Sequence, residues 1–147
     1  MNIDKNKTII KKSEKQTNWY IVDAGKYKLG RLISSITYIL KNKNSVDYLP
    51  YMEGYSNIII INSHKVQVTG RKSKQKFYKR HSGRPGGLKK ESFEKLQERI
   101  PNRIIENALK GMLPKNSLGK KLLKKIKIYP SLEHPHESQK PTEINID

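Results

Sequence analysis

The sequence predicts a single α/β domain, and three observations support this fold class. A strand, a helix and a second strand follow one another between residues 19 and 62. The second strand contains four consecutive isoleucines, which is typical of a parallel sheet covered on both faces. The second half of the chain has its apolar residues mainly at helical spacing. A chain of 147 residues suits one such domain with a modest core.

The first strand is expected over WYIVDA, residues 19–24, which are aromatic and β-branched and end before Gly25. Trp19 is expected to be an anchor in the core or at its rim, although a nucleic-acid base could also stack on its ring. A helix is then expected over LGRLISSITYILKN, with Arg31 pointing away from its apolar face. That face holds Leu29, Leu32, Ile33, Ile36, Ile39 and Leu40.

The second strand is expected over residues 57–62, after a loop punctuated by Pro50 and Gly54. Val66 and Val68 are expected to extend this strand or to start another one.

Two helices are expected between residues 91 and 113. The first, ESFEKLQERI, has Glu91 and Glu94 near its start, where the helix dipole favours acids. Pro101 ends it and can serve as the first residue of the second, NRIIENALKGM. Gly111 is the expected C-cap, and Pro114 prevents the helix from continuing.

The composition favours a polyanionic partner. Lys and Arg number 31 against 13 acids, which gives a net charge of +18. There are no cysteines, so disulfides, Cys-ligated metals and thiol catalysis are excluded. The longest apolar run is Ile58 to Ile61, far too short to span a membrane.

The first cationic stretch, KFYKRHSGRPGGLKK, covers residues 76–90, and the chain holds no acid from residue 54 to residue 90. Either a partner outside the chain supplies negative charge to this segment, or the segment remains a solvated basic loop. Aromatic residues interleaved with cations and glycines are typical of contacts to unpaired RNA bases and phosphates. SGRPGG matches neither the P-loop nor the dinucleotide motif, so it is either a phosphate-contacting loop or an ordinary turn.

The second cationic stretch runs from residue 110 to residue 127 and contains seven lysines and no acid. It predicts a helix with a lysine face and an apolar face, although Ile126 to Tyr129 could instead form a short strand. A membrane-surface helix has a similar pattern, but the domain core can take this apolar face. The remaining residues, 131–147, are expected to be extended.

Catalytic and metal sites are not predicted. His134 and His136 in EHPHE lack a third ligand at a suitable spacing, and the zinc motif HExxH is not matched. His64 is expected to be a rim residue, and His81 has no acid within nine residues to orient it. The sequence thus predicts no enzyme, no metal, no cofactor and no small-molecule substrate.

Several motifs together resemble a known family, the thirteenth large-subunit ribosomal protein of the bacterial L-series, in its cyanobacterial and plastid branch. They occur in family order and cover nearly everything from Trp19 to Pro141. The motifs are WYIVDA, LGRL, NIIIINSHKVQVTG, YKRHSGRPGGLK, RIPNRIIENALKGMLPKNSLGK, KIKIYP and EHPH.

This resemblance implies a three-layer α/β/α domain with a small, mainly parallel sheet, basic loops and extended termini. It implies a structural component of the large ribosomal subunit that binds large-subunit rRNA, touches neighbouring ribosomal proteins and supports early assembly. Residues 1–17 would be a flexible basic extension, 18–141 the domain and 142–147 a tail. The implied location is the plastid ribosome in the chloroplast stroma, with the bacterial cytoplasm as the alternative.

The expected RNA-binding residues lie in the two cationic stretches. The phosphate-binding cations of the first stretch are expected to be Arg71, Lys72, Lys74, Lys76, Lys79, Arg80, Arg84, Lys89 and Lys90. The other residues expected to touch RNA in that stretch are Tyr78, His81, Ser82, Gly83, Gly86 and Gly87. The second stretch adds Lys115, Lys120, Lys121, Lys124 and Lys125.

Two other functions remain open from the sequence. One is a nucleic-acid-processing enzyme that uses His81 or the acids of EHPHE, and the other is a basic protein that compacts DNA.

Overall fold

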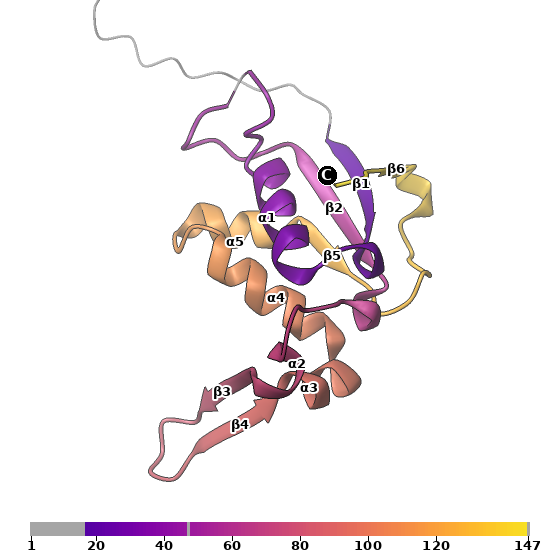
Figure 1. The fold of residues 1–147 in the computed structure, drawn as a ribbon. Coiled ribbons are helices and arrows are strands. Elements are labelled where there is room, and N and C mark those ends of the chain that lie inside the picture. Colours follow the sequence, from indigo (N-terminus) through magenta and orange to yellow (C-terminus); the bar gives the residue numbers. More distant parts are fainter. Residues whose placement is uncertain (1–16, 47, 147) are drawn as a thin grey trace, which may run out of the picture.

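Four strands pair in parallel to form the central sheet, in the order β5-β2-β1-β6 (Figure 1). The strands are β1 (Asn18–Asp23), β2 (Ser56–Ile61), β5 (Ile126–Ile128) and β6 (Thr142–Glu143). The computed structural model describes residues 17–46 and 48–146, so the expected extension over residues 1–17 lies outside the described residues except for Thr17. The sheet confirms the predicted α/β class.

The run of isoleucines in β2 is explained by burial on both faces of the sheet. Ile58 and Ile60 belong to the main core cluster, whereas Ile59 must point to the opposite face because side chains alternate along a strand. All three are fully buried. The prediction of a strand covered on both sides is therefore confirmed.

Helices α1 (Leu29–Leu40), α4 (Pro101–Met112) and α5 (Ser117–Lys124) cover one face of the sheet. The connections from β1 to β2 and from β2 to β5 step in the same direction, and right-handed crossovers then place their helices on the same face. Helices α1 and α4 share one core cluster with β1 and β2. Arg31 is exposed on α1, as predicted.

The C-terminal segment covers the opposite face and contains the short 3-10 helix η3 (Glu137–Gln139). The Trp19 and His136 rings lie with centroids 5.4 Å apart, and the Tyr129 hydroxyl is 2.8 Å from Nε2 of His136. Trp19 is half-buried, as expected of a rim anchor. Residues 142–146, which the sequence set apart as a tail, join the fold through β6 and the buried Ile146.

Two local predictions were wrong. Val66 and Val68 form no strand: Asn62 has a φ of 56°, the chain turns into the 3-10 helix η2 (Ser63–Lys65), and only an isolated bridge joins Lys28 to Gln67. Gly111 does not cap α4, because the Leu113 amide still donates to the Leu109 carbonyl at 2.8 Å. The next residue, Pro114, has no N–H to continue the helix. Of the two alternatives for residues 126–129, the strand is correct.

The predicted basic loop is instead an antiparallel hairpin that projects from the body of the fold (Figure 1). It consists of β3 (Phe77–His81) and β4 (Leu88–Ser92), which lie between the one-turn helix α2 (Lys72–Gln75) and helix α3 (Phe93–Arg99). Glu91 therefore belongs to β4 and not to the start of α3, where Glu94 lies in the first turn. Cross-strand hydrogen bonds give order to a segment with almost no apolar residues.

Within residues 17–46 and 48–146, no helix combines the length and apolar character needed to cross a membrane.

Candidate nucleic-acid interface

Residues 71–92, here called the arm, place like charges directly opposite each other. In the β3–β4 ladder Lys79 pairs with Lys90, and Arg80 pairs with Lys89. Opposed like charges destabilise an antiparallel pair, and a two-stranded hairpin is marginally stable even without them. The arm therefore carries a local electrostatic cost that a bound polyanion would relieve.

The root of the arm is held by the Arg99–Glu91 ion pair and by Phe93, whose ring is buried. Arg99 donates to both carboxylate oxygens of Glu91, at 3.0 and 2.6 Å, and this contact lowers the pKa of Glu91 and raises that of Arg99. The Phe93 amide donates to the Lys76 carbonyl at 2.9 Å. These contacts fix the direction in which the arm leaves the domain.

The two aromatic residues of β3 lie on opposite faces of the hairpin. Tyr78, expected from the sequence to contact RNA, is half-buried against the core, and burial raises the pKa of its hydroxyl. Phe77, one of the interleaved aromatics of the sequence but not among the expected RNA-binding residues, is 55% exposed. Alternation along β3 separates the two rings, so Phe77 has the more accessible surface for stacking on a base.

The glycines at the tip of the arm form a tight turn. Gly83 and Gly86 have φ values of 85° and 72°, which favour glycine. The Gly87 amide donates to the Arg84 carbonyl at 2.9 Å, and the Gly83 amide donates to Nδ1 of His81 at 2.9 Å. These two amides already have acceptors within the chain, so the exposed side chain of Arg84 is the main group that the tip offers to a phosphate.

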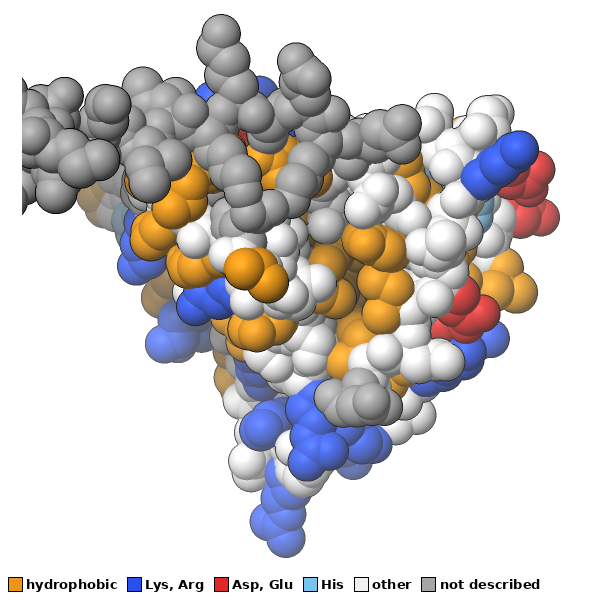
Figure 2. Space-filling view, turned by 90° about the horizontal axis from the view of Figure 1, so that it is seen from above, with side chains coloured by type: hydrophobic (Ala, Val, Ile, Leu, Met, Phe, Trp, Pro, Cys, Tyr) orange, Lys and Arg blue, Asp and Glu red, His pale blue; other side chains and the backbone are white. Residues whose placement is uncertain are grey.

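All nine cations expected in the first stretch are exposed. In the face shown in Figure 2, the largest group of Lys and Arg side chains lies at the lower edge, and others lie on the left and right sides, while the Asp and Glu side chains lie mainly along the right edge. The nine are Arg71, Lys72, Lys74, Lys76, Lys79, Arg80, Arg84, Lys89 and Lys90.

The second cationic stretch does not join the first. Helix α5 follows the C-terminal end of α4, whereas the arm leads into α3 and the N-terminal end of α4 (Figure 1). A helix of this length separates its ends by roughly 18 Å. The structure thus presents two separate basic areas, one on the arm and one on α5.

Two lysines of the second stretch already have acidic or carbonyl partners. Lys121 Nζ lies 2.8 Å from Oε1 of Glu53, and this contact lowers the pKa of the Glu53 carboxyl. Lys125 Nζ lies 3.5 Å from Oε2 of Glu53 and donates to the Gly54 carbonyl at 2.7 Å. Of the five lysines of this stretch that were expected to bind RNA, Lys115, Lys120 and Lys124 remain exposed for an external anion.

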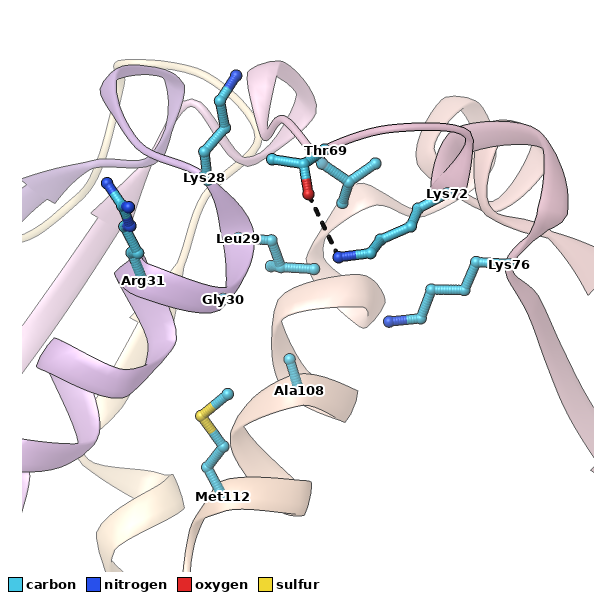
Figure 3. A pocket seen from close by; sticks show the side chains of 10 residues that line it. Lys28, Leu29, Gly30, Arg31, Thr69, Lys72, Lys76, Ala108 and Met112 are labelled. Carbon is cyan, nitrogen blue, oxygen red and sulfur yellow. Dashed lines mark hydrogen bonds between the residues drawn. The ribbon is translucent and has the colours of Figure 1, made fainter.

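Sequence reasoning missed a pocket that brings Lys28 and Arg31 close to Lys72 and Lys76 (Figure 3). About forty residues separate the two pairs along the chain, so no local pattern could reveal their proximity. Arg103 is likewise brought next to Tyr78 and Arg80 at a second hollow beside the arm.

The histidines take part in structural contacts. His64 Nδ1 contacts the Pro130 carbonyl, and His136 contacts Tyr129. In the part of the chain that the structure describes, no three His, Cys, Asp or Glu side chains cluster as a metal site would require.

Comparison with known proteins identifies the family of this chain. The model of the family "Ribosomal protein L13" matches residues 17–135. The chain is 57% identical over 129 residues to large ribosomal subunit protein uL13 of Crocosphaera subtropica, covering 88% of this chain and 85% of that protein. It is 54% identical over 132 residues to uL13 of Trichormus variabilis, covering 90% and 87%. It is 52% identical over 143 residues to uL13 of Rippkaea orientalis, covering 97% and 95%. With a family model that spans most of the folded part and relatives that match almost end to end, the chain belongs to the ribosomal protein L13 family.

Proposed function

We propose that this chain is an architectural component of the large ribosomal subunit that binds large-subunit rRNA. The observation that carries the proposal is the pair of like-charged cross-strand contacts in the exposed arm. Such an arrangement makes physical sense when the partner supplies closely spaced negative charges, as a nucleic-acid backbone does.

The residues have distinct proposed roles. The arm cations neutralise phosphates, His81 and Ser82 contact sugar or base edges near the tip, and the ring of Phe77 stacks on an unpaired base. Gly83, Gly86 and Gly87 keep the tip narrow enough to enter a groove. Tyr78 positions the arm from its half-buried site. The exposed lysines of the second stretch bind a separate part of the RNA.

The number of cations implies a strong dependence on salt. If about ten of them each neutralise a phosphate, log K falls with log salt with a slope near −7 to −9. The affinity then drops roughly 10⁴-fold between 50 and 200 mM salt. An interface of this size fits a long folded RNA and not a small substrate.

We propose a plastid ribosome as the location, with a bacterial ribosome as the alternative. The cyanobacterial relatives named above are consistent with both. The role is structural and non-enzymatic, and we expect the chain to touch neighbouring large-subunit proteins and to join the subunit early in assembly.

The test is a double charge reversal in the arm, Arg80→Glu with Arg84→Glu. Because both side chains are exposed, the fold should be preserved, and retention of transcribed large-subunit rRNA on filters in 150 mM salt should fall at least 100-fold. Lys43→Glu with Lys140→Glu is the matched control, since it changes the net charge equally at exposed positions outside both basic areas. Equal loss in both variants would show a nonspecific charge effect and would contradict the proposal.

Two further measurements separate the alternative functions. A DNA-compacting protein would bind duplex DNA as well as rRNA in direct competition, whereas the proposed function requires preference for rRNA. A catalytic role for His81 would be supported if His81→Ala abolished a nucleic-acid-processing activity, whereas a structural role expects that variant to enter large subunits on sucrose gradients.

A further inference from the structure

The pocket that sequence reasoning missed has the size of a small-ligand site. It lies between the N-terminal end of α1, the segment around Thr69 and the C-terminal half of α4 (Figure 3). Its volume is about 560 Å³. Sites for small ligands usually enclose roughly 300–1,000 Å³.

Four cations and no acid line this pocket. Lys72 and Lys76 extend into the space between α1 and α4, while Lys28 and Arg31 extend outward from the α1 side (Figure 3). The Lys72 ammonium donates to the Thr69 hydroxyl at 3.3 Å, and Lys28 Nζ donates to Oε1 of Gln67 at 2.7 Å. Side chains of the same charge around one cavity repel each other, so an anion is the chemistry that fits it.

The floor of the pocket is apolar. Leu29, Val68, Ala108 and Met112 line it, and Met112 remains 43% exposed. A methionine thioether makes favourable contacts with an aromatic ring and adapts to its shape. A bare phosphate needs no such floor, whereas a nucleotide presents both a charged phosphate and a flat apolar base.

We propose that this pocket holds one unstacked nucleotide of the bound RNA, with its phosphate between Lys72 and Lys76 and its base against Leu29, Val68 and Met112. The inference rests on the proposed function, because the nucleotide belongs to the rRNA. It adds Lys28 and Arg31 to the interface as cations that receive the flanking phosphates.

Gly30 offers a test that leaves the charge unchanged. A Cβ added at Gly30 would meet no atom within 4 Å, and leucine favours a helix more than glycine does. Gly30→Leu should therefore fold normally while filling the pocket. We expect its affinity for transcribed large-subunit rRNA to fall about tenfold, with a melting temperature no lower than that of the wild type.

Removal of the charges provides the second test. Lys72→Gln with Lys76→Gln should weaken binding of the same RNA about tenfold. It should also make the slope of log K against log salt shallower by about one to two. Lys43→Gln with Lys140→Gln, at exposed positions outside both basic areas, is the matched control and should change the affinity less than threefold.

The outcomes distinguish the pocket from the general function. If the wild-type chain fails to bind the RNA, the proposed function fails. If the wild type binds and Gly30→Leu binds equally well, only the pocket assignment is overturned, because the lysines then act as diffuse counterions.

Binding of uridine 5′-monophosphate tests whether the pocket holds a nucleotide of the RNA or a free nucleotide. We expect it to bind only at millimolar concentration and to be displaced by the rRNA. Micromolar affinity that the rRNA does not compete would assign the pocket to free nucleotides and overturn the proposal.

Discussion

The β1–β2 ladder and the β3–β4 ladder are both pairs of neighbouring strands, but opposite kinds of side chain face each other in them. In β1–β2 the register places Ile21 beside Ile59 and Val22 beside Ile60, and the sheet is covered on both faces. In β3–β4 it places Lys79 beside Lys90 and Arg80 beside Lys89, all exposed.

This difference shows that the two ladders are stabilised from different sources. Burial of apolar surface stabilises the first at roughly 25 cal/mol per Å². The second has little apolar surface to bury and keeps its geometry through backbone hydrogen bonds, the turn glycines and the contacts at its root. The domain body is therefore stable by itself, whereas we expect the arm to reach full order only with an anionic partner.

The largest expected effect is a difference in unfolding free energy between a substitution in the domain body and one in the arm. Ile105 is fully buried in α4, so Ile105→Ala should lower the free energy of unfolding by about 2–5 kcal/mol in urea denaturation. Leu88, at the end of β4, is 48% exposed, and Leu88→Ala should change it by no more than about 0.5 kcal/mol. Comparable losses would mean that the arm is part of the cooperative core.

A second contrast uses two helical glycines. A Cβ at Gly119 would lie 1.8 Å from the Pro114 carbonyl oxygen, so Gly119→Ala should cost about 1–3 kcal/mol of unfolding free energy. A Cβ at Gly111 would meet nothing within 4 Å, so Gly111→Ala should stabilise α4 by about 0.5–1 kcal/mol. Thermal melts of the two variants should shift in opposite directions; shifts of the same sign would show that the close approach does not set the cost.

A third change should stabilise the arm while weakening its binding. Lys89→Glu converts the contact with Arg80 into a pair of opposite charges, which should stabilise the hairpin by about 0.2–1 kcal/mol. The same change removes a proposed phosphate contact and should reduce rRNA affinity about tenfold or more. Amide exchange over residues 78–91 and filter binding would measure the two effects. Slower exchange together with unchanged binding would contradict the assigned role of the arm.

The smallest effect concerns pH at the root of the arm. Arg99 holds the pKa of Glu91 below its usual value, so the pair stabilises the arm above the unfolded pKa, near 4.5, and this contribution is lost as the pH falls through the lower folded value. We expect amide exchange in the arm, corrected for its intrinsic pH dependence, to rise a few-fold over that range while α4 stays protected. Glu91→Gln should remove this pH dependence. Its persistence in that variant would assign it to another group.

Much of the sheet and its helices could be predicted, because buried positions are occupied by apolar residues at regular spacings along the sequence. The run Ile58–Ile61 indicated a strand covered on both faces, and the apolar spacing from Leu29 to Leu40 indicated α1. The arm was mistaken for a loop because its strands, FYKRH and LKKES, show no apolar alternation, and a hairpin held by backbone hydrogen bonds and turn glycines needs none. Val66 packs in the core without a strand because the left-handed Asn62 redirects the chain before it.

By itself, the sequence determined the fold class, the family resemblance and the excess of positive charge, because these depend on residue types and short-range spacing. Only the tertiary structure decided which charges act together. It paired Lys121 and Lys125 with Glu53, turned Tyr78 toward the core, and placed Lys28 beside Lys72 around one pocket. The physical reason is that electrostatic interaction depends on distance through space, and residues far apart in the chain approach each other only when the apolar core folds.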